Sequence, residues 1–124
     1  MISGVGIDII EVARLAKMIS RENSSLLKIF TQTEIDYCRK FKNGIQNFAG
    51  RFAVKEAFSK AMGTGKSSGL KFREIETVND HLGKPEIRLY GSTKEIFLSK
   101  ELKVAHVSIS HLKDYATAVV ILEK

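Results

Sequence analysis

Two carboxylates and a lysine lie beside apolar segments of this sequence, where a charged side chain needs a reason other than exposure to solvent. Asp8 lies within the apolar segment 4–10, and Glu56 lies on the edge of an apolar helical stripe. A carboxylate in such surroundings is costly unless it has a partner or a metal ion. Lys60 comes one helical turn after Glu56, and the glycine loop 63–65, whose backbone can approach a ligand closely, follows it. This combination is typical of a site that handles phosphate.

Each of these features also has a structural explanation. Asp8 by itself is more typical of a cap for the helix that begins near Glu11. Glu56 and Lys60 form an i, i+4 pair, which is worth about 0.3 kcal/mol on a helix surface. A Gly-Thr-Gly loop more often ends a helix than binds a ligand. The presence of all three features together favours the phosphate site.

The elements that must position these residues follow from the spacing of apolar side chains. In the first half this spacing is mostly helical, and Thr31 with Glu34 forms a capping-box pattern. The second half alternates as strands, with a helix capped by Ser92 or Thr93. The predicted elements are a buried strand over 1–10, helices over 11–21, 26–30, 31–41, 45–62 and 92–102, and strands over 72–79, 86–90, 104–110 and 116–122. This order predicts an α+β fold in which an antiparallel sheet packs on a long helix.

Composition bounds the class of protein. The 124 residues predict a single domain over residues 1–124, and a content of 44% apolar and 27% charged residues is ordinary for a folded protein. No apolar run approaches the roughly 20 residues of a membrane helix, and the N-terminus does not resemble a signal peptide. The one cysteine, Cys38, fits a reducing compartment, so we expect a cytoplasmic protein that does not enter a membrane. The net charge of +6 implies an acidic partner, which nucleic acid, anionic lipid or an acidic protein would satisfy.

Three motifs taken together resemble one enzyme family. They are GVGIDII around Asp8, RFAVKEAFSKAMGTG from Arg51 to Gly65, and VSISH ending at His111. In order and spacing they resemble the holo-acyl-carrier-protein synthases, the short bacterial 4'-phosphopantetheinyl transferases, over nearly all of the chain. The resemblance implies the 4'-phosphopantetheinyl transferase fold and a magnesium-dependent transfer of 4'-phosphopantetheine from coenzyme A to a serine of apo-acyl carrier protein. Adenosine 3',5'-bisphosphate is the implied second product, and fatty acid biosynthesis is the implied pathway.

The resemblance also implies roles for single residues. Asp8 and Glu56 would hold Mg²⁺ on the diphosphate of coenzyme A, with phosphate oxygens and water completing its shell; Mn²⁺ is an alternative ion. Lys60 would face the diphosphate and neutralise charge on the leaving group. Either a metal-linked water or Glu56 would deprotonate the serine. The other implied contacts with coenzyme A are Arg51, which suits the 3'-phosphate, and Gly63, Gly65, Pro85, Ser110 and His111.

Two charged rows have both a default and a functional interpretation. Arg51 and Lys55 form an i, i+4 row that would by default be solvated. Arg14, Met18 and Arg21 share one face of the first helix, opposite its apolar stripe, and would usually be solvated too. An exposed methionine between arginines fits a docking surface for an acidic amphipathic helix better. The resemblance implies that the acidic acyl carrier protein docks there.

The resemblance implies a homotrimer whose active sites lie between subunits, with Ser110 and His111 reaching a neighbouring site. The chain also has more apolar side chains than a small sheet with one helix layer can cover, so we expect some of them to lie between subunits. The candidates for these contacts are Phe48, Phe52, Phe58, Val107 and Ile109.

Two other function classes remain for a small basic protein. A nucleic-acid-binding module needs aromatic residues interleaved with basic ones on an exposed strand, and the strand over 104–110 has none, so we expect no nucleic-acid partner. A non-catalytic sensor of coenzyme A or a nucleotide would keep Arg51 and the glycine loop but has no use for Asp8 and Glu56. Turnover of coenzyme A with apo-carrier protein separates these classes from the transferase.

Overall fold

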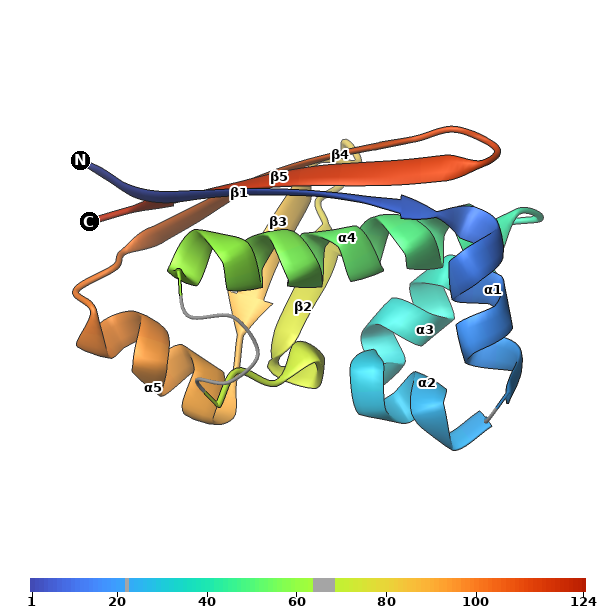
Figure 1. Cartoon of the computed structure of the whole chain (residues 1–124), viewed down its shortest axis with the longest axis horizontal. Coiled ribbons are helices and arrows are strands. Elements are labelled where there is room, and N and C mark those ends of the chain that lie inside the picture. The colour runs from blue at the N-terminus through green and yellow to red at the C-terminus, as the bar shows by residue number, and fades with distance from the viewer. Residues whose placement is uncertain (22, 64–68) are drawn as a thin grey trace.

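A computed structural model of the chain describes residues 1–21, 23–63 and 69–124, and the side chains of residues 21 and 23–25 are also outside the described part. The helix α4 (Gly44–Met62) lies under a three-stranded antiparallel sheet in the order β1–β5–β4 (Figure 1). These strands are β1 (Ile2–Glu11), β4 (Val104–His111) and β5 (Tyr115–Glu123). The predicted α+β fold, an antiparallel sheet on a long helix, is confirmed.

Helix α4 is buried on almost all sides. The sheet covers one side, while α1, α3 and β2 pack against the others, and only Lys60 among residues 44–62 is exposed. The apolar stripe predicted for this helix is therefore buried, but so are its other faces. The default interpretation of Arg51 and Lys55 as a solvated row is wrong, because both side chains are buried where the helix runs through the middle of the molecule.

Three short helices gather near the first turns of α4 (Figure 1). They are α1 (Val12–Arg21), α2 (Asn23–Ile29) and α3 (Gln32–Arg39). The predicted capping box of α3 is confirmed: Glu34 N–H donates to Thr31 Oγ1 (3.2 Å), and Thr31 N–H donates to Glu34 Oε1 (3.1 Å). None of the described helices is both long enough and apolar enough to cross a membrane.

A second, two-stranded antiparallel sheet is formed by β2 (Ile75–Asn79) and β3 (Pro85–Leu89). The strand predicted over residues 72–79 begins later because Phe72–Glu74 form a 3-10 turn. In this turn the carbonyl of Phe72 accepts a hydrogen bond from Lys55 Nζ (2.8 Å). The buried Lys55 therefore uses a backbone carbonyl that a longer strand would have used for pairing.

The last helix, α5 (Gly91–Ser99), differs from its prediction at both ends. The hydroxyls of Ser92 and Thr93 do not cap it but donate to Glu74 Oε1, at 3.1 Å and 2.8 Å.

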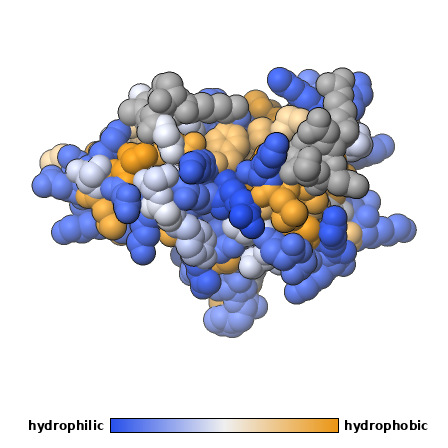
Figure 2. Space-filling model, turned by 90° about the horizontal axis from the view of Figure 1, so that it is seen from below, coloured by the Kyte–Doolittle hydropathy of each residue, from blue (hydrophilic) through white to orange (hydrophobic). Residues whose placement is uncertain are grey.

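On the side of the molecule opposite the three-stranded sheet, polar side chains surround separate apolar patches (Figure 2).

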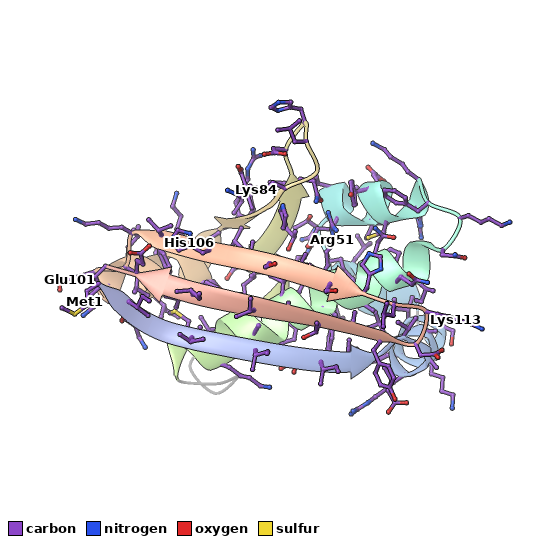
Figure 3. The ribbon with its side chains drawn as sticks, turned by 90° about the horizontal axis from the view of Figure 1, so that it is seen from above. Met1, Arg51, Lys84, Glu101, His106 and Lys113 are labelled. Atoms are coloured by element: carbon purple, nitrogen blue, oxygen red, sulfur yellow. The ribbon has the colours of Figure 1, made fainter. Side chains whose placement is uncertain are left out.

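Strand β1 is not the buried strand that its composition predicted. Val5, Ile7 and Ile9 are 60%, 64% and 67% exposed on its outer face, whereas Asp8 is on the face toward α4. Seen from above, no described element lies over the three strands (Figure 3). Only one face of the strand is buried, because the described elements of the chain leave the other face uncovered (Figure 3).

Three of the five apolar residues expected between subunits are packed inside the chain. The phenylalanines Phe48, Phe52 and Phe58 are buried, and Val107 and Ile109 pack partly buried against the same core. The expectation is wrong for the three phenylalanines, because the helices and both sheets cover more surface than one helix layer would. For the half-buried Val107 and Ile109 it stays a prediction. The exposed apolar face of the sheet is on β1 instead.

Candidate active site

Asp8 and Glu56 line one pocket. It measures about 280 Å³, is bounded by β1, α1 and α4, and is called the carboxylate pocket below. Its other lining residues are Ile9, Ile10, Arg14, Met18 and Phe52. The packing of β1 on α4 thus brings together two acidic residues that are far apart in the sequence.

Two glycines allow β1 to lie close to α4. A Cβ atom on Gly4 would overlap the carbonyl oxygen of Ala61, and one on Gly6 would overlap that of Ala57. A backbone carbonyl within a helix cannot move aside, so any side chain at these positions would push the strand away. The glycines therefore set the depth at which Asp8 reaches into the carboxylate pocket.

Lys60 contacts Asp8, one of the residues that line this pocket. Its ammonium donates to Asp8 Oδ1 (3.2 Å) and to the carbonyl of Ile7 (2.9 Å). The Lys60 side chain is 56% exposed and that of Asp8 is 15% exposed. An ion pair so open to water is weak, so Lys60 can exchange Asp8 for another anion at little cost.

The carboxylate pocket fits a divalent cation that prefers oxygen ligands. The Lys60 ammonium beside Asp8 shows that positive charge is already accommodated there. In the described part of the chain, no group of three or more His, Cys, Asp or Glu side chains could hold a metal ion. An ion held by Asp8 and Glu56 would therefore need further oxygens from water and from a bound ligand.

A second pocket, of about 200 Å³, surrounds Arg51 and is called the Arg51 pocket below. Arg51 is 3% exposed; its Nη2 donates to Asn79 Oδ1 (2.5 Å), and its Cζ lies 4.1 Å from the centre of the Tyr37 ring. Its Nε is buried without a hydrogen-bond partner. None of the described residues that line this pocket is acidic; they are Tyr37, Asn47, Gly50, Arg51, Asn79, Gly83, Pro85, Ile109 and His111. A buried guanidinium in such surroundings favours an anionic ligand.

The end of β4 forms one wall of the Arg51 pocket. His111 lies there, with its Nδ1 3.0 Å from Gln46 Oε1. A Cβ atom on Gly50 would lie 2.9 Å from Ile109 Cγ2, so the glycine lets β4 approach α4 closely. Ser110 does not line this pocket, because neighbouring residues of a strand point to opposite faces of the sheet. Of the contacts expected for coenzyme A, Arg51, Pro85 and His111 are brought together here.

The two pockets lie at opposite edges of the three-stranded sheet. β1 and β4 are its edge strands, with β5 between them, and Figure 3 shows Arg51 beyond the β4 edge, beside the hairpin that carries Lys84. Gly63 ends α4 in the left-handed conformation (φ 79°) and lines neither pocket. Gly65, expected to contact the ligand, lies outside the described residues.

The expected docking residues are next to the carboxylate pocket. Arg14 is exposed, and Met18 is half-buried rather than exposed, because it packs partly against the core. Both line the carboxylate pocket. The side chain of Arg21 lies outside the described part of the chain.

Sequence reasoning missed the residues that hold Arg51. Neither Asn79 nor Tyr37 belongs to a motif, since their contacts with Arg51 arise only when the β2–β3 hairpin and α3 pack on α4. Asn47, Gly50 and Gly83 line the Arg51 pocket in the same way. No local pattern could have marked these residues.

Comparison with known proteins identifies the family of this chain. The family model of the 4'-phosphopantetheinyl transferase superfamily matches residues 4–120. This chain belongs to that family. A holo-[acyl-carrier-protein] synthase of Geobacter sp. (strain M21) is 45% identical to this transferase, with 100% of both chains covered. The resemblance inferred from the motifs, and the prediction of an enzyme, are confirmed.

Solved structures support the same assignment. The holo-[acyl-carrier-protein] synthase of Neisseria meningitidis is similar with a TM-score of 0.91 and 31% identity, covering 100% of both chains. That of Bacillus anthracis str. Ames, in complex with CoA (3',5'-ADP), has a TM-score of 0.82 and 40% identity, covering 100% of this chain and 98% of its own.

Proposed function

We propose that this transferase moves 4'-phosphopantetheine from coenzyme A to a serine hydroxyl of apo-acyl carrier protein and releases adenosine 3',5'-bisphosphate. The carboxylate pocket carries the proposal, since Asp8 and Glu56 lie beside Arg14 and Met18. A site for a divalent cation thus adjoins a basic, partly apolar surface that suits an acidic protein. The Bacillus anthracis protein, whose structure is in complex with CoA, supports coenzyme A as the donor.

In this proposal Asp8 and Glu56 hold Mg²⁺, which would neutralise charge on the diphosphate when bound. The carrier serine forms a bond to the phosphorus joined to pantetheine, and Glu56 accepts the hydroxyl proton. The bond from that phosphorus to the bridging oxygen breaks, and the bisphosphate leaves with the electron pair. Lys60 turns from Asp8 to the departing phosphate and stabilises its charge.

The Arg51 pocket takes the 3'-phosphate of coenzyme A. The Arg51 guanidinium lines the pocket and supplies both the charge and hydrogen-bond donors. Pro85 and His111 complete this end of the ligand, while Gly63 and Gly65 are expected to contact it where α4 ends.

The active site is proposed to be shared between the subunits of a homotrimer. The two pockets lie at opposite edges of one sheet. The carboxylate pocket of one subunit would therefore form an active site with the Arg51 pocket of a neighbouring subunit rather than with its own. The uncovered face of β1, with Val5, Ile7 and Ile9, would be buried on assembly. Ser110 would then face a neighbouring subunit. We place the protein in the cytoplasm, in fatty acid biosynthesis.

The direct test is turnover of coenzyme A with purified apo-acyl carrier protein and Mg²⁺, followed by mass spectrometry of the carrier. A mass increase of one phosphopantetheine supports the proposal, and an unmodified carrier contradicts it. Mixing an Asp8→Ala chain with a His111→Ala chain then tests the shared site. Some activity should return, because a mixed trimer can contain one site with both residues intact, and a mixture as inactive as each variant alone would contradict sharing.

A further inference from the structure

A fully buried ion pair lies beside the Arg51 pocket. Lys55 and Glu34 are both 0% exposed, and Lys55 Nζ is 2.8 Å from Glu34 Oε1. The same ammonium also donates to the carbonyls of Phe72 (2.8 Å) and Ile75. Its three hydrogens are therefore all used, and burial holds the pKa of Lys55 below its ordinary value while Glu34 opposes that shift.

The carboxylate of this pair is equally occupied. Glu34 Oε1 also accepts from Thr31 N–H (3.1 Å), as part of the capping box, and Oε2 accepts from Thr77 N–H (3.1 Å). Glu34 lies in the first turn of α3, Lys55 belongs to α4, and Thr77 is in the middle of β2. One ion pair thus fastens both α3 and the β2–β3 hairpin to the central helix.

The elements fastened by this pair are the walls of the Arg51 pocket. α3 supplies Tyr37, which stacks on Arg51, and the hairpin supplies Asn79, which accepts from Arg51 Nη2. Gly83 and Pro85 come from the same hairpin, and Asn79 Nδ2 donates to the Gly83 carbonyl (2.9 Å). Arg51 itself lies one turn before Lys55 on α4.

We propose that Lys55 and Glu34 are positioning residues for coenzyme A, acting through the walls of the Arg51 pocket. They hold α3 and the hairpin at the separation from α4 at which Tyr37 and Asn79 orient the Arg51 guanidinium. Neither residue lines the pocket, and both are sealed from solvent, so neither touches the substrate. This inference rests on the proposed function of the Arg51 pocket.

The pair is expected to act on affinity rather than on the chemical step. Lys55 precedes Glu56 in the sequence, yet its side chain points away from the carboxylate pocket and into the core formed by Glu34 and Ile75. Glu56, the next residue on α4, faces the carboxylate pocket instead. Loss of the pair should therefore raise KM for coenzyme A and leave kcat and KM for the carrier nearly unchanged.

The test uses the double variant Lys55→Met/Glu34→Gln, because removing one partner alone would leave an unpaired buried charge. Folding is checked by circular dichroism, and the Kd of adenosine 3',5'-bisphosphate is measured by calorimetry. We expect this Kd and the KM for coenzyme A to rise about tenfold, with kcat within about twofold of the parent. A folded double variant that binds adenosine 3',5'-bisphosphate as tightly as the parent would overturn the proposal.

Two further variants keep the result interpretable. Thr93→Val is the matched control, because Thr93 is buried and links α5 to the 3-10 turn through Glu74, away from the Arg51 pocket; it should lower thermal stability and leave Kd unchanged. If the double variant does not fold, Glu34→Asp decides, since it keeps the charge but shortens the link. A Kd equal to that of the parent in a folded Glu34→Asp protein would then overturn the proposal.

Measurements on the parent protein show whether a negative result contradicts this inference or the proposed function. Parent protein that binds adenosine 3',5'-bisphosphate and modifies the carrier, with an unaffected double variant, would overturn the positioning role alone. Parent protein that neither binds the bisphosphate nor modifies the carrier would overturn both. Binding without turnover, with weaker binding in the double variant, would support positioning and contradict the transfer reaction.

Discussion

Lys60, Arg51 and Lys55 carry the same charge at three depths, and depth decides what each can do. The Lys60 ammonium is largely exposed and can change partners. Arg51 is buried but lines a pocket with no acidic residue among its described lining, so its guanidinium favours an anionic ligand. Lys55 is buried with every donor used, so it holds structure together.

The carboxylates of the carboxylate pocket give the sharpest prediction at this scale. Asp8→Asn or Glu56→Gln should lower kcat on the order of 100-fold or more while leaving a folded protein, because each removes an anionic ligand of the ion. Mn²⁺ binding, followed by electron paramagnetic resonance, should weaken in parallel. Asp36→Asn, an exposed carboxylate on α3, is the control and should match the parent. Turnover close to that of the parent in either variant at saturating Mg²⁺ would contradict the proposal that Asp8 and Glu56 hold the metal ion.

Cys38 gives a prediction about pH. Burial is the main cause that raises the pKa of its thiol from 9.0 to about 12 in the folded protein. The unfolded chain releases this proton near pH 9 and the folded chain retains it, so the stabilising contribution is complete below pH 9 and is lost as the pH rises toward 12.

Urea unfolding of the parent and of Cys38→Ala between pH 8 and 11 measures this contribution. As the pH rises, the free energy of unfolding of the parent should fall relative to that of Cys38→Ala. A difference between the two proteins that does not change with pH would contradict the raised pKa. The folded parent should also resist a thiol reagent at pH 8 that reacts at once with the unfolded chain.

At the scale of elements, the contact between β1 and α4 builds the carboxylate pocket. Gly4 and Gly6 face the carbonyls of Ala61 and Ala57, and the strand carries Asp8 next to Glu56 only because it lies so close. The Cα of Asp8 pairs with that of Ala118 of β5, which fixes the register of the strand. The proposed metal ligands therefore depend on the position of two glycines that have no reactive group of their own.

Gly6→Ala tests this dependence. A methyl group that overlaps a helix carbonyl must displace the strand, and we expect a loss of about 1–3 kcal/mol in stability. Activity should fall as well, since Asp8 moves with the strand. Ser3→Ala, at an exposed position of the same strand, is the control. Thermal unfolding and turnover measured on both variants decide the matter, and a Gly6→Ala protein as stable as Ser3→Ala would contradict the close approach.

At the scale of the whole molecule, the sheet has one covered and one uncovered face. α4 lies under the sheet, and the apolar side chains of Val5, Ile7 and Ile9 stand on the open side. Apolar side chains gathered in this way on one strand are typical of a surface that assembles. The net charge of +6 is a second property of the whole surface and suits an acidic partner.

Assembly is tested by placing a charge on the open face. The parent should scatter light as about three times 13.9 kDa. Val5→Lys/Ile7→Lys, at two exposed positions that line neither pocket, should give a folded monomer with little activity, because each site would lose its neighbour. Leu98→Lys, at an exposed leucine of α5, should remain a trimer. A parent protein that is a fully active monomer at nanomolar concentration would refute the shared site.

Carrier docking is tested by reversing one charge beside the carboxylate pocket. Arg14→Glu should raise KM for the acidic carrier about tenfold and leave KM for coenzyme A unchanged. The parent rate at sub-saturating carrier should also fall with added salt, because exposed charges are screened beyond about 8 Å at physiological ionic strength. Lys94→Glu on α5 makes the same charge change elsewhere. An equal effect of the two variants would show that net charge, not docking, matters.

Much of the fold could be predicted from local pattern. The capping box of Thr31 and Glu34, the span of α4 and the hairpin before Tyr115 follow from turn chemistry and periodicity, which act over a few residues. The solvated Arg51–Lys55 row was wrong because periodicity reports that a face is apolar, not how many faces are covered. The caps assigned to Ser92 and Thr93 failed because Glu74, distant in sequence, takes their hydroxyls.

By itself, the sequence determined the family and the candidate residues Asp8, Glu56 and Lys60, because their types and spacing are local and chemically unusual. Only the tertiary structure decided that Asp8 and Glu56 share one pocket while Arg51 and His111 share another. It also decided that Arg51 is held by Tyr37 and Asn79 rather than by solvent. The physical reason is that side chains distant in sequence meet only where packing of β1, α3 and the hairpin on α4 brings their backbones together.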